Sequence, residues 1–384
     1  MRVLFVDDEV RVLEALERAL FDSEPTWQTA FARRADSAFV ELSKHAYDVV
    51  VSDLRLSGID GVRFLSRVRE LHPRAVRIVL SAHGDALDSL MLVRVAHQFI
   101  AKPCAAETLR QVIARTRDLN RVLGDHKLQS IVGRVDTLLP APELRQRLLA
   151  LLQAEEASAA ELAAVIKQDP AMTSKLLQVA NSAFFDSAQS VADVETAVER
   201  LGPQLLRDLT LGLGVFALAA RGPDAPATSV EEIQRRSLAI ARTAARMARL
   251  PEDASVAYLA GLLCDVGQLV LASKVPERLY VAQAEAHQAG VPAHVAEQAT
   301  WGATHAELGA YLLGIWGLPF QLVEAVANHH SPERHAEEQV GLPQLVWLAA
   351  CIVDGEEPQA EYLHRFGAEE LYAGARAAFE AEGN

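Results

Sequence analysis

The sequence is poor in cysteine: its 384 residues include only three, Cys104, Cys264 and Cys351. They lie far apart and show none of the paired spacing that a disulfide framework or a thiolate zinc site requires. We therefore expect neither, and we expect the three thiols to be buried as small hydrophobic side chains.

A long apolar segment is also missing from the start of the chain. The first short apolar run is followed directly by Asp7 and Asp8, so it has neither the length nor the flanks of a signal peptide or a membrane span. We expect a cytoplasmic protein that contacts no membrane.

Positive charge is scarce, with 37 Lys and Arg against 51 Asp and Glu and a formal net charge of -14. An excess of negative charge repels phosphate backbones, and no basic stripe or recognition-helix pattern reverses it. DNA is therefore disfavoured as a partner.

The sequence does contain a clear change of pattern near Leu119. Before this residue, short apolar runs alternate with amphipathic stretches, which predicts an α/β domain with a five-stranded parallel sheet covered on both faces. The expected strands are Val3–Val6, Thr26–Phe31, Asp48–Ser52, Val76–Ser81 and Gln98–Ala101; the expected helices are Val10–Phe21, Asp36–Lys44, Gly61–Leu71, Leu87–Val95 and Ala105–Leu119.

After Leu119 the strand pattern stops. The remainder is rich in Ala, Leu and Glu and is interrupted by Pro and Gly, which predicts an all-α domain. We place the α/β domain at residues 1–120, a connecting helix or linker at 121–137, and the helical domain with a C-terminal helical tail at 138–384.

Functional side chains stand at the carboxyl ends of the expected strands, where a parallel sheet gathers its reactive groups. Asp7 and Asp8 follow the first strand, Asp53 ends the third, Ser81 ends the fourth and Lys102 follows the fifth. Three carboxylates at one edge repel one another unless a hard divalent cation lies between them, and Mg²⁺ is the intracellular candidate.

This set of residues fits phosphoryl transfer to a carboxylate. We expect Asp53 to attack a phosphorus atom, Lys102 and Mg²⁺ to neutralise charge on the phosphoryl oxygens, and Ser81 to donate a hydrogen bond to the new group. An acidic pair alone is more often a pair of helix N-terminal acids. The combination with the third, fourth and fifth strand ends indicates a functional site.

The segments LFVDDE, VVVSDLRLSGIDG, IVLSAHGD and FIAKPC resemble the receiver domains of bacterial response regulators in two-component systems, over the first 120 residues. The resemblance implies a flavodoxin-like, doubly wound fold and phosphorylation of Asp53 by a sensor histidine kinase. It also implies Mg²⁺ held by Asp8, Asp53 and the backbone carbonyl of Arg55, with Asp7 assisting. One departure is Ser57, where the family usually has proline, and we expect little effect from it.

The same resemblance implies a switch. In receiver domains the hydroxyl residue, here Ser81, moves toward the phosphoryl group, and an aromatic residue on the last strand, here Phe99, turns inward. The alternative is that Phe99 is a plain core residue. Phosphorylation adds about -1.5 to -2 charges, and we expect it to change pairing through the face at roughly residues 85–119 and to favour a homodimer.

The helical half resembles a second family. Its segments LPAPELRQRLLALL, AAVIKQDPAMTSKLLQVANSAFF, TAVERLGPQLLRDLTL, GLLCDVGQLVL, HAELGAYLLGIWGLP and AVANHH resemble the HDOD branch of the HD phosphohydrolase superfamily, from about Leu138 to Val353. Active HD enzymes aim several His and Asp side chains at a metal that keeps an open position for water. The candidates here are Asp265, Glu297, His305, His329 and His330.

Three positions depart from the ligand set of active HD enzymes. Arg236 stands at the first histidine, Cys264 at the histidine of the His-Asp pair and Ala350 at the late aspartate, so that only Asp265 survives of these four. A guanidinium has no lone pair and repels a cation. We therefore predict a catalytically degenerate HDOD domain without a cofactor.

The histidines then need another explanation. We expect His305 to form hydrogen bonds across the old metal pocket, and His329 and His330 to interact with the C-terminal dipole of their helix. Asp169 before Pro170 is interpreted as a helix break and cap.

The sequence therefore indicates a phosphoprotein of a phosphorelay, in which phosphorylation of Asp53 controls a non-catalytic HDOD domain that binds another signalling protein. Two alternatives stay open in a cyclic dinucleotide pathway. One is a metal-dependent phosphohydrolase with Asp265 and His305 at the metal. The other is a nucleotide-binding effector that uses Arg236 as a phosphate clamp. Separately, the thiolate of Cys264 is a candidate ligand for a soft metal together with Asp265 and His305.

Overall fold

The computed structural model describes residues 1–21, 27–82, 93–154, 157–182, 190–212, 227–334 and 340–382. The chain divides into two compact units. The first comprises Met1–Asp136, Gln178–Ser190 and Tyr311–Gly317, and the second comprises Thr137–Leu177, Val191–Ala310 and Leu318–Asn384.

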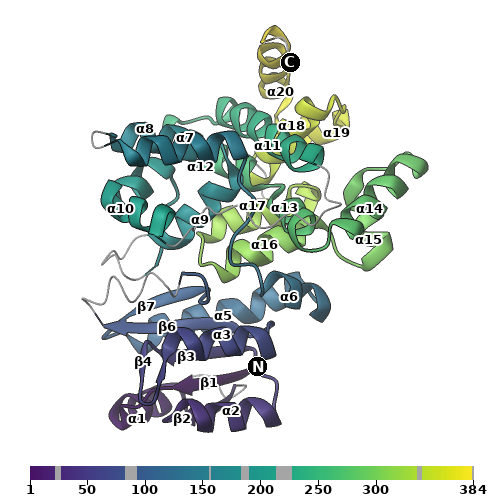
Figure 1. Ribbon diagram of the computed structural model, residues 1–384. Helices are drawn as coiled ribbons and strands as arrows, with labels where there is room; N and C mark the ends of the chain where they lie inside the picture. The colour runs from purple at the N-terminus through teal and green to yellow at the C-terminus, as the bar shows by residue number, and fades with distance from the viewer. Residues whose placement is uncertain are drawn as a thin grey trace. The chain divides into compact units, whose positions relative to one another are not determined.

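The first unit contains the predicted five-stranded parallel sheet, in the order β2-β1-β3-β6-β7 (Figure 1). Its inner strands are continuous apolar runs because both of their faces are buried. Every predicted strand is found, with ends that differ by one or two residues. The strands are β1 (Arg2–Val6), β2 (Gln28–Ala32), β3 (Val49–Asp53), β6 (Val76–Ala82) and β7 (Gln98–Lys102).

Helices pack against this sheet. Helix α1 packs against α5, whereas α2 contacts β1 and β2, and α3 contacts β3. The predicted helix Leu87–Val95 lies for the most part outside the described residues. The helices described here are α1 (Val10–Phe21), α2 (Ala35–Lys44), α3 (Gly61–Leu71) and α5 (Ala106–Val122).

A small antiparallel hairpin follows β3 and was not predicted. It pairs β4 (Arg55–Leu56) with β5 (Ile59–Asp60). Its turn consists of Ser57 and Gly58, and the φ of +91° at Gly58 is one that glycine adopts without steric cost. The hairpin fixes Ser57 at the same edge of the sheet as the end of β3.

The last helix of the sheet domain does not run on as one connecting helix. Helix α5 ends at Val122, and the Asp125 side chain begins a separate helix, α6 (His126–Val132), by accepting two backbone hydrogen bonds. The guanidinium of the buried Arg77 donates from Nη2 to the carbonyl oxygen of Gly133 at 2.8 Å. The predicted linker at 121–137 thus contains a short helix that is attached to the first unit.

The second unit is helical throughout its described part, which confirms the predicted fold class. Helix α10 has a kink at Gly202 and Pro203. The helices are α7 (Pro142–Gln153), α8 (Ala159–Ile166), α9 (Pro170–Ala180), α10 (Val194–Arg207), α11 (Ala227–Met247), α12 (Pro251–Leu263), α13 (Val266–Lys274), α14 (Pro276–Ala289), α15 (Ala293–Trp301), α16 (His305–Ile315), α17 (Phe320–Asn328), α18 (Leu342–Asp354), α19 (Ala360–Phe366) and α20 (Glu369–Ala381), with a π turn at Asp208–Gly212 and a 3-10 turn at Pro332–Arg334.

The most apolar stretch of this unit is Asp253–Lys274, which comprises most of α12 and all of α13. It is long and apolar enough to cross a membrane by length and composition, but 72% of its apolar window is buried inside the structure. Within this stretch, α12 packs against α11 and α18, which also contact each other. The stretch therefore has the burial of a core element of a helical domain.

A glycine lets α13 approach α16 closely. A Cβ atom at Gly267 would lie only 1.9 Å from the carbonyl oxygen of His305, a backbone atom that cannot move aside. The absence of a side chain at Gly267 therefore brings the start of α16 next to Asp265, which lies between α12 and α13.

Candidate functional site

The carboxyl ends of β1, β3 and β7 bring four charged side chains together. Lys102 Nζ lies 2.7 Å from Asp7 Oδ2 and 2.7 Å from Asp53 Oδ1. Carboxylate oxygens of Asp7, Asp8 and Asp53 all lie within 4.8 Å of one another. The parallel register of β1 and β3 ends both strands at the same level, and this is why acids so far apart in sequence meet.

The electrostatics of this edge depend on burial and on one ammonium group. Burial raises the pKa of Asp53, and the neighbouring Lys102 offsets this effect only in part. Burial also opposes the charge on Lys102, but hydrogen bonds to Asp53 and Asp7 outweigh it and raise the pKa of Lys102. Lys102 is therefore held as a cation. Oxygen atoms from three carboxylates are a donor set that fits a hard cation such as Mg²⁺.

Three other predicted residues lie on β6, β7 and β4. Ser81, at the end of β6, is 3% exposed, and Phe99, on β7, is 5% exposed. The backbone N–H of Arg55 donates to Asp53 Oδ2 at 3.2 Å, so the Arg55 backbone runs beside this carboxylate.

The third acid, Asp8, has a partner that the sequence analysis did not foresee. The Ser57 hydroxyl, in the turn between β4 and β5, donates to Asp8 Oδ2 at 2.5 Å. This contact links Ser57 directly to a carboxylate of the cluster.

In the second unit, Arg236 on α11 forms an ion pair with two aspartates. Its Nη1 donates to Asp265 Oδ2, while Nε and Nη2 donate to the two oxygens of Asp354 at 2.9 and 2.7 Å. Burial opposes the charged guanidinium, but Asp265 and Asp354 raise the pKa of Arg236 above its ordinary value. Burial would likewise raise the pKa of Asp265, yet Arg236 and His305 hold it far below its usual range.

His305 lies between two buried carboxylates at the start of α16. Its Nδ1 is 2.7 Å from Glu297 Oε2, and its Nε2 is 3.3 Å from Asp265 Oδ1. Burial lowers the pKa of His305, but the charges and hydrogen bonds of Glu297 and Asp265 outweigh it and raise the pKa to about 9. The ring is therefore an imidazolium at neutral pH, with an N–H for each carboxylate.

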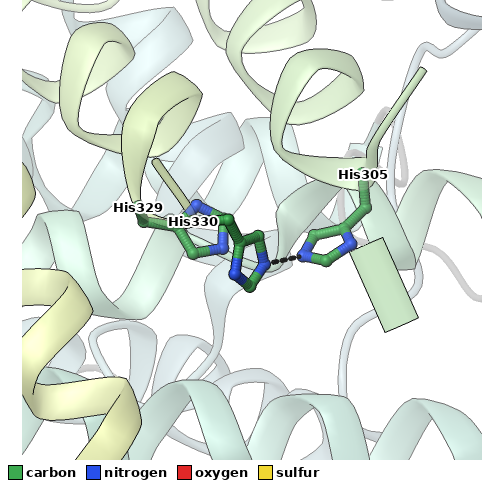
Figure 2. A group of neighbouring side chains, drawn as sticks. All are labelled: His305, His329 and His330. Carbon is green, nitrogen blue, oxygen red and sulfur yellow. Dashed lines mark hydrogen bonds between the residues drawn. The ribbon is translucent and has the colours of Figure 1, made fainter. Parts of the chain in front are cut away.

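Two more histidines, His329 and His330, contact His305 from the end of α17. We call these three histidines, together with Arg236, Asp265, Glu297 and Asp354, the HDOD pocket. Figure 2 shows the rings of His305 and His330 pointing toward each other, with their Nε2 atoms 2.9 Å apart. The Nε2–H of His305 thus faces both Asp265 and His330. Burial together with the charge of neighbouring groups holds the pKa of His330 well below its ordinary value. Burial, reinforced by His305, lowers the pKa of His329 to about 3. Because His329 Nδ1 lies 2.7 Å from the carbonyl oxygen of Val326, His329 is neutral with its proton on Nδ1.

Cys264 and Ala350, the other two departures, are both buried. Burial and the charge of Asp265 hold the pKa of Cys264 well above its ordinary value, so this side chain is a thiol at neutral pH. Two groups nevertheless place their ligand atoms within 4.8 Å of one another, namely His305 with His329 and His330, and Cys264 with Asp265 and His329.

Two residues that contact this group, Asp354 and His294, were not predicted from the sequence. Asp354 lies one helical turn beyond Ala350 on α18 and therefore on the same face, so the spacing of four residues was a signal that was available. The ring of His294, on α15, stacks on His330 with centroids 4.0 Å apart. Nothing in the sequence near His294 indicates this contact.

Comparison with known proteins identifies the two domains. Residues 3–114 match the response regulator receiver domain, and residues 138–332 match the HDOD domain. An uncharacterized protein of Treponema pallidum is 26% identical over 342 residues, which are 83% of this chain and 65% of that protein. The hydrogenase transcriptional regulatory protein HoxA of Cupriavidus necator is 35% identical over 147 residues, which are 38% of this chain and 29% of HoxA.

A solved structure, the MmoQ response regulator from Methylococcus capsulatus, shares 26% sequence identity and covers 63% of this chain and 98% of that chain, with a TM-score of 0.49. The chain spans less than two thirds of the two curated relatives named above. The HDOD match alone covers more than half of the chain. The chain therefore belongs to the HDOD family and is a response regulator in which a receiver domain precedes the HDOD domain.

Proposed function

We propose that Asp53 accepts a phosphoryl group from a sensor histidine kinase and that the HDOD domain is a non-catalytic output that binds another signalling protein. One observation carries the first half of this proposal. The Lys102 ammonium lies 2.7 Å from both Asp7 and Asp53, and the Asp8 carboxylate stands within 4.8 Å of both acids.

Each residue of this edge has a task in the proposed transfer. The Asp53 carboxylate attacks phosphorus while the phosphorus–nitrogen bond to the kinase histidine breaks and that histidine leaves. Lys102 holds negative charge on the transferred group, and the Ser81 hydroxyl donates a hydrogen bond to it. Asp7, Asp8, Asp53 and the backbone carbonyl of Arg55 would hold Mg²⁺, which supplies positive charge at the phosphoryl oxygens. Phe99, as a buried residue of β7, is the proposed reporter of the change in Ser81.

Acetyl phosphate tests the acceptor directly. Wild-type protein incubated with acetyl phosphate and Mg²⁺ should gain one acid-labile phosphoryl group in intact mass, and Asp53→Asn should gain none. Asp60→Asn is the matched control, because Asp60 lies in the hairpin that follows Asp53 and begins α3 by accepting a hydrogen bond from Val62 N. Undiminished phosphorylation of Asp53→Asn would place the acceptor elsewhere.

The charge pattern of the HDOD pocket supports a non-catalytic role. Arg236 fills the position of a metal-binding histidine and offers no lone pair, and its guanidinium already neutralises Asp265 and Asp354. The imidazolium of His305 does the same for Asp265 and Glu297. This donor set does not fit the metal arrangement of the active HD enzymes, because cations of the protein itself occupy the carboxylates.

A second candidate is a residual metal-dependent phosphohydrolase in a cyclic dinucleotide pathway. Two observations favour it: the metal-compatible groups around His329, and the buried Nε2 of His329, which has no hydrogen-bond partner among the described residues. Metal analysis of purified protein decides between the candidates. Stoichiometric Fe, Mn or Zn that is lost in Asp265→Ala would favour the enzyme. A nucleotide-binding role for Arg236 finds less support, because all three of its donor nitrogens already bond to carboxylates.

The remaining proposals concern assembly and location. We propose a cytoplasmic protein that forms a homodimer when Asp53 is phosphorylated and that binds neither DNA nor membranes. Light scattering with and without beryllofluoride tests the homodimer, since beryllofluoride mimics the phosphoryl group. A mass that stays monomeric in both states would contradict it.

A further inference from the structure

The Ser57 hydroxyl is tied to the acidic edge by the hairpin that carries it. Ser57 and Gly58 form the turn between β4 and β5, and the residues on either side pair as Leu56 with Ile59. A two-residue turn restricts the backbone of Ser57, so the hairpin sets where its Cβ lies. From there it donates to Asp8 Oδ2 at 2.5 Å, across 49 positions of sequence.

Asp8 differs from its two neighbours in how it is held. The Lys102 ammonium bonds to Asp7 and Asp53 at 2.7 Å each. Asp7 also accepts from the backbone N–H of Glu9 at 2.9 Å, and Asp53 accepts from that of Arg55 at 3.2 Å. Within the described part of the chain, the hydrogen bond from Ser57 is the one that orients the Asp8 carboxylate.

We propose that Ser57 is a positioning residue that orients Asp8 for Mg²⁺. The inference rests on the proposed receiver site. The Ser57 hydroxyl donates to Asp8 Oδ2, so Asp8 Oδ1 is available to bind the ion. Hydrogen-bond donors outside the ligand shell of a metal commonly orient a carboxylate ligand in this way. A proline at this position, as the receiver resemblance leads one to expect, has no donor. This chain therefore uses a side-chain contact that the usual sequence cannot form.

A magnitude follows from the behaviour of other metal sites. Loss of a residue that orients a metal ligand typically weakens metal affinity by about 10- to 100-fold. Ser57 lies on an exposed turn, so the lower end applies, and Ser57→Ala should weaken Mg²⁺ binding about tenfold. Ser57→Thr keeps the hydroxyl and should bind Mg²⁺ as the wild type does.

Calorimetric titration of the full chain with MgCl₂ is the test. Ser43→Ala is the matched control, because this serine lies on the exposed side of α2 and its hydroxyl bonds only to the carbonyl oxygen of Val40. Circular dichroism verifies that each variant is folded. We expect equal dissociation constants for the wild type, Ser57→Thr and Ser43→Ala, and a dissociation constant about tenfold higher for Ser57→Ala.

A kinetic readout separates positioning from a general loss of structure. With acetyl phosphate, Ser57→Ala should need more Mg²⁺ for half-maximal phosphorylation but reach the wild-type rate when Mg²⁺ is saturating. Unchanged or tighter Mg²⁺ binding by Ser57→Ala would overturn the inference, and tighter binding would mean that the hydroxyl competes with the ion. Failure of the wild type itself to bind Mg²⁺ would instead refute the proposed metal site, and the role of Ser57 with it.

Discussion

Replacing His305 by Gln tests whether a protonated imidazole holds the HDOD pocket together. In the wild type this ring is 1% exposed and lies between the carboxylates of Glu297 and Asp265. Glutamine keeps a hydrogen-bond donor but cannot take up a proton. The difference in stability between the two proteins therefore isolates the contribution of the charge.

The magnitude follows from linkage between protonation and folding. The pKa of His305 is about 9 in the folded protein against 6.5 as its ordinary value. With about 1.4 kcal/mol for each pKa unit, protonation of this ring stabilises the fold by about 3 kcal/mol. Because the folded pKa is the higher one, the full contribution is present below pH 6.5 and is lost as the pH rises to about 9.

Protonation of His329, a neighbour of His305, has the opposite effect on the stability of the fold. Burial lowers the pKa of His329 to about 3 from an ordinary value of 6.5. The unfolded chain then binds a proton that the folded chain does not, so this group destabilises the fold as the pH falls below 6.5. His305 and His329 together predict that the HDOD domain is most stable near pH 6.5.

Urea unfolding at pH 6 and pH 9 measures the effect. The stability gap between the wild type and His305→Gln should shrink by about 3 kcal/mol over this range. Nitrogen NMR adds a direct readout, with protons on both ring nitrogens of His305 at pH 7.5 and on Nδ1 alone for His329. A neutral His305 at that pH, or a gap independent of pH, would refute the reasoning.

Three further substitutions test other parts of the helical domain. Arg236→Ala removes one of the two cations that face the buried Asp265 and should lower the free energy of unfolding by about 3 to 5 kcal/mol in urea titrations; a loss below 1 kcal/mol would show that the ion pair with Arg236 is not needed. Asp169 is fully buried and accepts hydrogen bonds from Ala141 N at 2.6 Å, Met172 N at 2.8 Å and Gln234 Nε2 at 3.1 Å. Asp169→Ala leaves these three donors buried without an acceptor, which costs about 1 to 3 kcal/mol each. The midpoint temperature of thermal unfolding should therefore fall by a large amount. Gly267→Ala places a methyl group against the backbone of His305 and should cost about 3 kcal/mol or more, whereas Gly374→Ala on α20, where no atom lies within 4 Å, should gain about 0.5 to 1 kcal/mol; equal effects of the two glycine substitutions would contradict the close approach of α13 and α16.

The receiver edge was predictable because parallel strands impose simple geometry. Once Asp7, Asp53 and Lys102 are assigned to strand ends, a parallel sheet must bring them to one edge, whatever the details of packing. The hydrophobic pattern predicted the ends of these strands to within two residues. The hairpin at Ser57 was not foreseen, since its two-residue strands are too short to show an alternating pattern.

The HDOD pocket was harder to predict because contacts between distant helices depend on crossing angles and on small residues. The sequence indicated Arg236 and Asp265, but not that Asp354 would complete the ion pair across 118 positions. The stacking of His294 on His330 depends on how α15 and α17 meet. Periodicity shows which face of a helix is apolar, but not which helix covers it.

The two domains treat a cluster of three carboxylates in opposite ways, and the charges explain why. At the receiver edge the cluster of Asp7, Asp8 and Asp53 contains one ammonium, that of Lys102, which pairs with Asp7 and Asp53, so a charge of about -2 remains for an external cation. In the HDOD pocket Asp265, Asp354 and Glu297 face Arg236 and the imidazolium of His305, so only about -1 remains. A divalent ion added there would leave buried positive charge without a partner, which is costly in a low-dielectric interior. Arg236, at the position where the HD resemblance leads one to expect a histidine, thus supplies one of the two cations that face these three carboxylates.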